Sequence, residues 1–250
     1  MMMMMPMATQ NTYLAVLAET IPDFSAADIE LLELARQHDA VMPVGIYFPL
    51  TCVMALETRL PDGCTYMLRL VGADGIVNLM DRDPVQYPVT ILKTGLAARL
   101  KNDGMERAIG ENPERVEHML ALYRARNALY ALNSGCLARH SLRQRLARLM
   151  LRAGLSYGLD REMTLTQVEI ARLIAARRET VAELLNRLAV DQVIKLRRGA
   201  IRILKRDTLR ETSCECFAEE MKLEHHVAVS IASMFRDFDY RDYVRSRSGD

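Results

Sequence analysis

The clearest pattern of apolar and polar positions lies between residues 164 and 206. From Arg178 to Val190 the apolar residues fall on one face of a helix and the charged residues on the other. A shorter helix precedes it and begins at a capping box, in which Thr166 is followed three residues later by Glu169. We expect residues 175–177 to form the turn between the two helices. The apolar positions of the first helix are Val168, Ile170, Leu173 and Ile174, expected to be buried in part, and those of the second are Val181, Leu184, Leu185 and Leu188.

Two β-prone segments follow the second helix. They are Val193–Leu196 and Ile201–Leu204, and they are joined by a short loop that contains Gly199. A short loop with glycine between two such segments predicts a hairpin. Two helices, a tight turn and a hairpin together predict a winged helix-turn-helix, an element that places its second helix in the DNA major groove. Arg197 and Arg198, at the hairpin tip, are suited to contact DNA phosphates.

The distribution of charge supports this prediction. The whole chain has 33 Lys and Arg against 32 Asp and Glu, whereas residues 141–210 hold 16 against 7. A nearly neutral total therefore conceals a basic segment, and basic domains bind nucleic acid largely through release of condensed counterions. The alternative is that the winged helix serves protein–protein contacts.

The segment resembles the DNA-binding domain of the Crp/Fnr family of bacterial regulators. The resemblance rests on residues 165–171 (LTQVEIA) and 178–181 (RETV), on the apolar positions down to Leu188, and on the hairpin. It implies that Arg178 hydrogen-bonds a guanine, that Glu179 accepts from a cytosine amino group, and that Gln167 and Thr180 contact phosphate. Arginine and glutamate match these bases in the groove code. We also expect Arg177 and Arg187 to contact phosphate.

Three positions depart from the family pattern. Glu183 replaces a residue that is often basic, so it would repel phosphate and is expected to face a different base. Ala175 stands where glycine is usual, and its β-carbon strains a left-handed turn. Arg177 replaces a small capping residue and predicts a weaker cap. These departures bear on the target sequence more than on DNA binding itself.

A long helix is predicted upstream, over residues 113–140. Asn112 is the expected N-cap and Pro113 the first helical residue. Alternating spacings of four and three residues resemble a coiled-coil seam and predict a dimerisation helix, with a single amphipathic core helix as the alternative. A second apolar line, which includes Leu129 and Cys136, is expected to face the N-terminal domain. The predicted dimer interface consists of Val116, Leu120, Tyr123, Asn127, Tyr130 and Leu137.

The N-terminal half has the sequence pattern of short strands joined by turns. Residues 25–36 are predicted to be a short helix, and Pro61-Asp62-Gly63 a hairpin turn. Residues 40–56 lack charge but contain two prolines, which favours buried strands over a membrane span. Residues 1–12 lack a periodic pattern and have no secretory signal. The predicted strands are Ile46–Phe48, Val53–Arg59, Thr65–Val71 and Val89–Lys93.

This half resembles a shortened form of the family's β-roll sensor domain. The matching segments are residues 45–49 (GIYFP), 61–63 (PDG) and 71–77 (VGADGIV). The Gly-Glu and Arg signature that holds a cyclic nucleotide is missing, because no Gly-Glu precedes Arg82. Cyclic-nucleotide binding is therefore not expected.

No cofactor, metal site or catalytic site is predicted. The five cysteines are scattered, and Cys214-Glu-Cys216 is too tightly spaced for an ordinary zinc finger, so two part-buried thiols on a C-terminal helix packed on the winged domain are expected. Nothing in the spacing of His38, His118 or His140 favours a haem, and an Fnr-type iron–sulfur cluster would need cysteines nearer the N-terminus. Phosphate-binding loops and hydrolase motifs are missing from the sequence, so it does not favour an enzyme.

These patterns combine into an α+β protein. We expect a reduced β-roll sensor at 13–112, a dimerisation helix at 113–140, a winged helix-turn-helix at 141–210, and a helical extension with a tail at 211–250. The capping box from Ser141 to Gln144 predicts that one helix ends and another begins there. The family resemblance implies that this point is the hinge between the sensor and the DNA-binding domain. The expected function is that of a cytoplasmic bacterial transcriptional regulator. Its partners would be a second copy of itself, a near-palindromic double-stranded DNA and RNA polymerase; a protein–protein adaptor is the alternative.

Overall fold

The computed structural model describes residues 11, 14, 29–79, 87–101, 113–158 and 161–233. Several predictions made from the sequence fall outside these ranges. They concern the N-terminal stretch before residue 11, the capping residue Asn112, Arg82 and the tail after residue 233.

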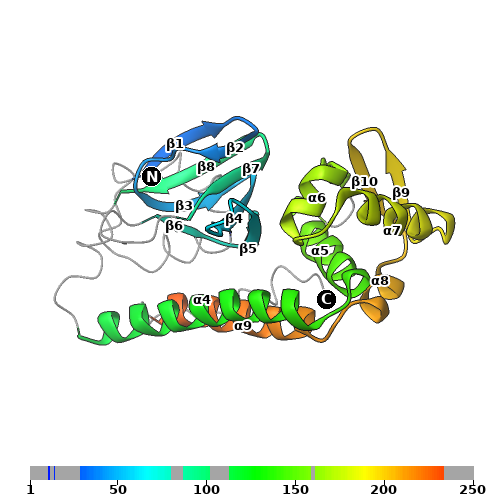
Figure 1. Ribbon diagram of the computed structural model, residues 1–250. Helices are drawn as coiled ribbons and strands as arrows, with labels where there is room; N and C mark the ends of the chain where they lie inside the picture. The colour runs from blue at the N-terminus through cyan, green and yellow to red at the C-terminus, as the bar shows by residue number, and fades with distance from the viewer. Residues whose placement is uncertain are drawn as a thin grey trace, which may run out of the picture.

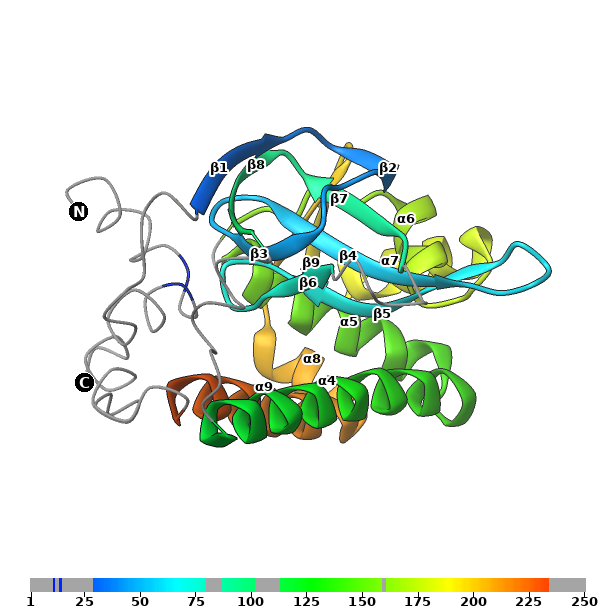
Figure 2. The same ribbon diagram turned by 90° about the vertical axis from the view of Figure 1, so that its left-hand side faces the viewer.

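The N-terminal part is built from two antiparallel four-stranded sheets (Figures 1 and 2). One sheet has the order β1-β8-β3-β6 and the other β2-β7-β4-β5. The strands are β1 (Ile29–Leu34), β2 (Gln37–Ala40), β3 (Gly45–Pro49), β4 (Val53–Arg59), β5 (Thr65–Val71), β6 (Val77–Leu79), β7 (Val89–Lys93) and β8 (Gly95–Leu100). The predicted β-roll is therefore present.

The four strands predicted from the sequence are confirmed. β4, β5 and β7 have the predicted bounds, and β3 extends one residue further at each end. The turn at residues 61–63 joins β4 to β5, with Gly63 at φ +84°. The four additional strands bring the described sheets to eight strands within residues 29–100, so the roll is short in sequence but keeps both sheets.

The helix predicted over residues 25–36 is wrong in its described part, where residues 29–34 form β1. The sequence of this segment alternates, so that Leu32 and Leu34 pack on the sheet core while Leu31 is 42% exposed. Pairing of β1 with β8 satisfies the backbone, and this tertiary pairing outweighs the local helical preference of leucine and glutamate.

The helices and the wing follow the predicted order. They are α4 (Pro113–Arg139), α5 (Leu142–Tyr157), α6 (Gln167–Leu173), α7 (Arg178–Val190), β9 (Ile194–Arg197), β10 (Ala200–Ile203), α8 (Arg206–Thr212) and α9 (Cys216–Ser233). The expected capping box at the start of α5 is present, because the Ser141 side chain accepts from the Gln144 backbone N–H and the Gln144 side chain accepts from the Ser141 backbone N–H. This box ends the long helix and sets the bend into α5.

The C-terminal helix α9 packs on the winged domain near its start, as predicted, through Phe217 in the shared core and through Glu220, which pairs with Arg148 of α5. It runs back along α4, in the opposite direction, below the sheets (Figure 1). The predicted helical extension therefore forms a two-helix layer with the predicted dimerisation helix. Leu129 of α4 is buried, and Cys136, which was expected to face the N-terminal domain, instead packs against Cys214 and Cys216 near the start of α9.

One apolar core continues from the sheet domain into the winged domain. Val53 and Leu70 from the sheet β2-β7-β4-β5 belong to the same buried cluster as Met150 of α5 and Leu173 of α6. Because both parts share buried surface, we expect the described domains to unfold together rather than independently.

Buried charges lie where the sheet, α5 and α9 meet. Arg152 is 2% exposed, and its guanidinium lies 2.5 Å from Asp74, 3.4 Å from Glu220 and 3.7 Å from Glu224. It also donates to the carbonyl of Leu70 at 2.9 Å. A buried arginine needs such partners, because an unpaired charge in the interior is strongly destabilising.

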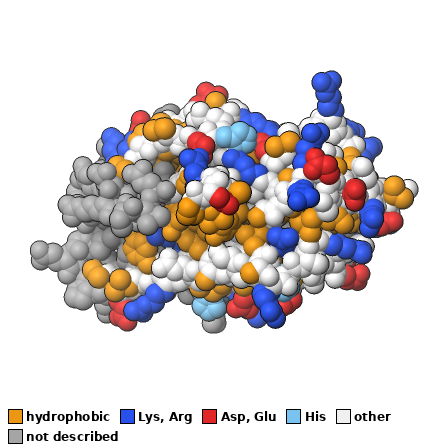
Figure 3. All heavy atoms as spheres, viewed as in Figure 1, with side chains coloured by type: hydrophobic (Ala, Val, Ile, Leu, Met, Phe, Trp, Pro, Cys, Tyr) orange, Lys and Arg blue, Asp and Glu red, His pale blue; other side chains and the backbone are white. Residues whose placement is uncertain are grey.

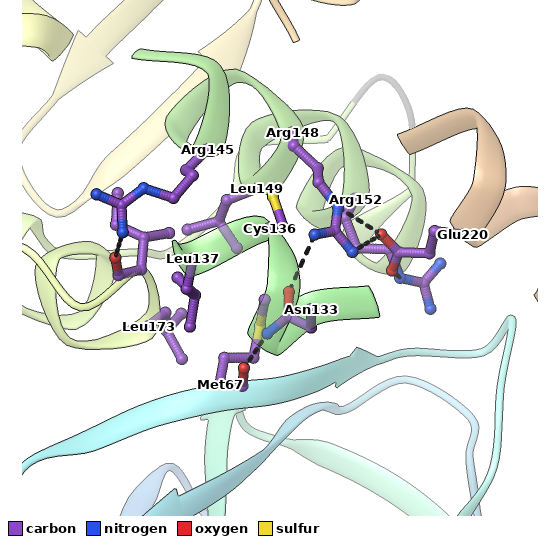
Figure 4. Close-up of a pocket in the computed structure, with 11 residues that line it drawn as sticks. Met67, Asn133, Cys136, Leu137, Arg145, Arg148, Leu149, Arg152, Leu173 and Glu220 are labelled. Carbon is purple, nitrogen blue, oxygen red and sulfur yellow. Dashed lines mark hydrogen bonds and ion pairs between the residues drawn. The ribbon is translucent and has the colours of Figure 1, made fainter. Parts of the chain in front are cut away.

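Two further arginines complete this buried ionic network. Arg148 donates to Glu220 at 2.8 Å and to the side-chain oxygen of Asn133 at 3.1 Å, as Figure 4 shows. Asn133 in turn donates to the carbonyl of Met67 on β5. Arg69, also on β5, donates to Glu224 at 2.5 Å. The network thus joins the sheet to α4, α5 and α9.

Replacement of Arg152 by alanine is expected to destabilise the protein severely. It would take this guanidinium from Asp74, Glu220 and Glu224. Because Glu220 keeps Arg148 and Glu224 keeps Arg69, we expect a loss in the free energy of unfolding at the lower end of the about 3–5 kcal/mol that follows when a buried charge loses its only partner. Chemical denaturation followed by circular dichroism measures this loss.

The matched control is Arg59→Ala, because Arg59 pairs with Asp39 while both side chains are 53% exposed. Exposed pairs contribute less than about 1 kcal/mol. Equal losses in the two variants would contradict the role assigned to the buried network.

Candidate DNA interface

The first helix of the predicted helix-turn-helix is α6, and its capping box is present. The Glu169 backbone N–H donates to Thr166 Oγ1 at 3.2 Å, and the Thr166 backbone N–H donates to the Glu169 carboxylate at 2.8 Å. The same carboxylate accepts from Arg36 of the sheet domain at 2.6 Å. Glu169 therefore both caps α6 and ties it to the sheet domain.

These contacts change the pKa of Glu169. Burial by itself would raise it, but hydrogen bonds from Thr166 and Arg36, together with the charge of Arg36, outweigh burial and hold the pKa below the usual 4.5. The carboxylate is therefore charged at neutral pH, as both of its roles require.

The turn between the helices confirms two expected departures from the family pattern. Ala175 has φ +48°, a left-handed conformation that costs a residue with a β-carbon more than it costs glycine. Arg177 occupies the N-cap position of α7 but makes no side-chain capping hydrogen bond. The second helix therefore begins with unsatisfied backbone N–H groups that face outward, the usual setting for an anionic ligand.

The second helix, α7, has the predicted two faces. Val181 and Leu185 are fully buried and Leu188 is nearly so, all in the core shared with α6. The opposite face is exposed, and it carries all predicted base-contacting residues and three of those predicted to contact phosphate: Arg177, Arg178, Glu179, Thr180, Glu183 and Arg187.

The prediction that Val168 is partly buried is wrong, because its side chain is 58% exposed. Val168 and Ile170 are two residues apart on α6, which places them on nearly opposite sides of the helix. Ile170 occupies the core side and leaves Val168 outside.

The wing is a tight hairpin. Arg197 pairs with Ala200, so the loop consists of Arg198 and Gly199, with Gly199 at φ +72°. Both arginines are exposed, as a phosphate contact needs. In this structure Arg197 also lies 2.9 Å from Glu162, so it would have to exchange this partner to bind phosphate.

A groove between α6, the start of α7 and the wing brings together four of the predicted residues. Gln167, Arg178, Arg197 and Arg198 all line it. Arg187 lies apart from this groove, in a hollow beside Arg143. Figure 3 shows Lys and Arg side chains projecting from the end of the molecule that carries the winged domain. The arrangement offers a cationic surface beside a polar helix face, which suits a phosphate backbone flanking a groove.

The residues predicted for the dimer interface divide into two groups. Val116 and Leu120 are 44% and 49% exposed, and Asn127 is also exposed. Tyr130 is buried and meets the ring of Tyr87 edge to face, with ring centroids 5.4 Å apart. Tyr123 and Leu137 are partly buried: Arg126 of the same helix lies over the Tyr123 ring, and Leu137 lines a pocket (Figure 4).

Four residues that the sequence analysis did not combine lie together at the far end of α4. They are Cys136, His140, Cys214 and Cys216, whose ligand atoms all lie within 4.8 Å of one another. A hydrogen bond from Cys214, with help from the charge of Arg148, lowers the pKa of the Cys136 thiol to about 5. The spacing of Cys136 and His140, one helical turn apart, was the available sequence signal.

Comparison with known proteins identifies the family of the winged domain. Residues 144–212 match the family described as the Crp-like helix-turn-helix domain. The chain carries a Crp-like DNA-binding domain. This Crp-like domain spans α5 to α8 and includes every residue predicted to contact DNA. No curated protein sequence matches the chain.

Solved structures show the same fold for most of the chain. FixK2 from Bradyrhizobium japonicum is similar at 14% identity and a TM-score of 0.63, over 74% of this chain and 98% of that one. A putative Crp/Fnr-family regulator from Eubacterium rectale is similar at 14% identity and a TM-score of 0.58, over 80% and 93%. A regulator from Thermus thermophilus gives 19% identity and 0.54, over 74% and 98%. The Crp-like domain and this fold confirm the predicted resemblance to Crp/Fnr regulators.

The described helices were also compared with the requirements of a membrane span. None of those in the described ranges combines the length and the apolar character needed to cross a bilayer.

The ionic contacts of Glu169 predict a pH dependence of stability. Because the folded-state pKa lies below the unfolded value of 4.5, the carboxylate stabilises the fold above pH 4.5 and loses this effect as the pH falls through the folded-state pKa. Free energies of unfolding for wild type and Glu169→Gln should differ most near neutral pH and converge in acid. A difference that grew as the pH fell would contradict the assigned charge.

Proposed function

We propose that this protein is a sequence-specific transcriptional regulator that binds a near-palindromic DNA site as a homodimer. It would act in the bacterial cytoplasm without catalysing a reaction, and RNA polymerase would be its further partner. The observation that carries the proposal is the exposed polar face of α7, led by Arg178, beside a groove lined by arginines of the wing.

The polar face of α7 has the chemistry needed to distinguish bases. The Arg178 guanidinium can donate two hydrogen bonds to the O6 and N7 atoms of guanine, and the Glu179 carboxylate can accept from the N4 amino group of cytosine. Arg177 and Thr180 lie on the same exposed end of the helix, where phosphate oxygens would meet the uncapped N–H groups. Base contacts would provide specificity, and phosphate contacts would set the position of the domain.

A dimer would supply the second half-site contact. Proteins of this class bind half-sites spaced about one helical turn of DNA apart, so that two recognition helices enter successive major grooves. The side of α4 turned away from the sheets and α9 exposes Val116, Leu120 and Asn127, and this face is where we place the dimer contact. Tyr130 and Leu137 would support α4 from within the chain instead.

The DNA-binding proposal predicts different effects for two arginines. After selection of bound genomic fragments has defined the site, Arg178→Ala should weaken specific binding by about 1–3 kcal/mol and relax one base position. Arg198→Ala should weaken binding to all DNA sequences about equally. It should also reduce the slope of log K against log salt concentration by about 0.9, since one phosphate contact is lost. Fluorescence anisotropy on matched and mismatched duplexes measures both.

Arg59→Ala, on the sheet hairpin, is the control and should bind like wild type. If the wild-type protein retained no duplex even at low salt, the adaptor function would be favoured instead. If Arg178→Ala lost only non-specific binding, the base-contacting role of Arg178 would be wrong.

The dimer proposal predicts the effect of a charge on α4. Leu120→Glu would place a carboxylate in the apolar contact, so sedimentation velocity should show a shift from dimer to monomer. Leu204→Glu is the matched control, because Leu204 is 51% exposed on the winged domain, away from α4. A wild-type monomer, or a Leu120→Glu dimer as stable as wild type, would argue against this interface.

A further inference from the structure

Three cysteines and one histidine from distant parts of the sequence meet at the junction of α4, α8 and α9. Cys136 and His140 lie one turn apart at the end of α4. Cys216 is the first residue of α9, and Cys214 lies in the short segment that joins α8 to α9. All three thiols are buried, and His140 is 18% exposed on its side chain. Two potential ligands therefore come from the end of α4 and the residue after it, and two from the first residue of α9 and the segment just before it.

The distances among these groups suit one tetrahedral metal ion. The Sγ atoms of Cys136 and Cys214 are 3.5 Å apart, and Cys216 Sγ lies 3.5 Å from His140 Nδ1. Zinc bonds of about 2.3 Å to sulfur and about 2.0–2.1 Å to nitrogen give tetrahedral edges of about 3.8 Å between sulfurs and about 3.6 Å between sulfur and nitrogen. These two distances lie within a few tenths of an ångström of the expected edges, and all four ligand atoms lie within 4.8 Å of one another, so small side-chain adjustments would bring them around one ion.

We propose that Cys136, His140, Cys214 and Cys216 form a mononuclear zinc site. Three thiolates and one imidazole are a common ligand set for structural zinc, and such closed sites leave no position for substrate. The proposal does not depend on DNA binding, since the site lies outside the groove formed by α6, α7 and the wing.

A disulfide or an iron–sulfur cluster fits the geometry less well. All five cysteines of the chain are free, and the 3.5 Å between Cys136 and Cys214 sulfurs exceeds the about 2.05 Å of a disulfide bond. A cluster of several irons needs more space between its ligands than four atoms within 4.8 Å of one another provide. A single ion is the occupant that this space accommodates.

The residues that contact the four potential ligands are arranged as is usual around a protein metal site. His140 Nε2 lies 3.2 Å from the Glu215 carboxylate, which leaves Nδ1 directed at Cys216. A carboxylate on the outer nitrogen fixes the tautomer of a metal-bound histidine and raises its basicity. One Zn²⁺ with three thiolates carries a net negative charge, and the buried guanidinium of Arg148, whose charge already acts on Cys136, would compensate for it.

A metal ion at this site would join the segments that precede and follow the Crp-like domain in the sequence. The two halves of the site flank residues 141–213, which contain α5 to α8, so an ion would fasten both ends of that domain to the end of α4. The bend between α4 and α5 follows His140 directly. A bound ion would therefore hold the hinge through which the sensor part meets the DNA-binding part.

The test is the metal content of the full-length protein, purified under reducing conditions with zinc supplied and then dialysed. Mass-spectrometric elemental analysis should find about one zinc per chain. Replacement by Co²⁺ should give thiolate-to-cobalt charge-transfer absorption and the intense visible bands of tetrahedral cobalt. Cys136→Ser and Cys216→Ser should lose the metal, and Cys64→Ser, which changes an exposed cysteine on the sheet hairpin, should keep it.

A variant that is expected to fold normally distinguishes a direct effect on metal binding from metal loss caused by misfolding. Glu215→Gln removes only the outer carboxylate, whose side chain is 82% exposed, and should weaken zinc affinity about 10–100-fold without changing the circular dichroism spectrum. Wild-type protein that binds neither zinc nor cobalt would overturn the proposal. So would a Cys136→Ser variant that keeps its metal, or a brown iron–sulfur chromophore in anaerobically prepared protein.

Discussion

The arrangement of this protein depends on a buried network of three arginines and their carboxylate partners. Arg69, Arg148 and Arg152 meet Glu220, Glu224 and Asp74 where the sheet, α5 and α9 converge. Charges at this depth are tolerated only when each has a partner in good geometry, so the network requires all three elements to be in place at once. These ion pairs tolerate smaller displacements of the three elements than apolar packing does, because leucine or methionine contacts adjust to small shifts.

This constraint explains why the sheet domain and the Crp-like domain are packed against each other. The shared apolar core joins α5 and α6 to the sheet, the buried network fixes α5 and α9 against β5, and the pair of Arg36 and Glu169 ties the capping box of α6 to the turn between β1 and β2. The first helix of the helix-turn-helix is thus held on two sides. α7 lies on the side of the winged domain away from the sheets (Figure 1), and Arg178, Glu179 and Glu183 on it are exposed in the presence of the sheet domain.

The roles of α4 follow from its three surroundings. One side meets the sheet through Asn133 and Tyr130, a second meets α9, and the third exposes Val116, Leu120 and Asn127. A helix with so little apolar surface free can join a partner only along that third side. At its end, the four potential zinc ligands lie between α4 and α9, so the sheet contact, the proposed dimer face and the proposed metal site all involve this one helix.

Local chemistry determined much of this protein from sequence alone. The capping boxes at Ser141 and Thr166, the two faces of α7, the hairpin glycines and three strands with their bounds follow from short-range backbone and side-chain preferences, and the structure has them. Only the tertiary structure decided that residues 29–34 form a strand, that Tyr130 faces inward, that α9 returns along α4, and that Cys136 and His140 meet Cys214 and Cys216. The reason is physical: each of these outcomes depends on partners far away in sequence, and short-range periodicity carries no information about which distant surface will cover a residue.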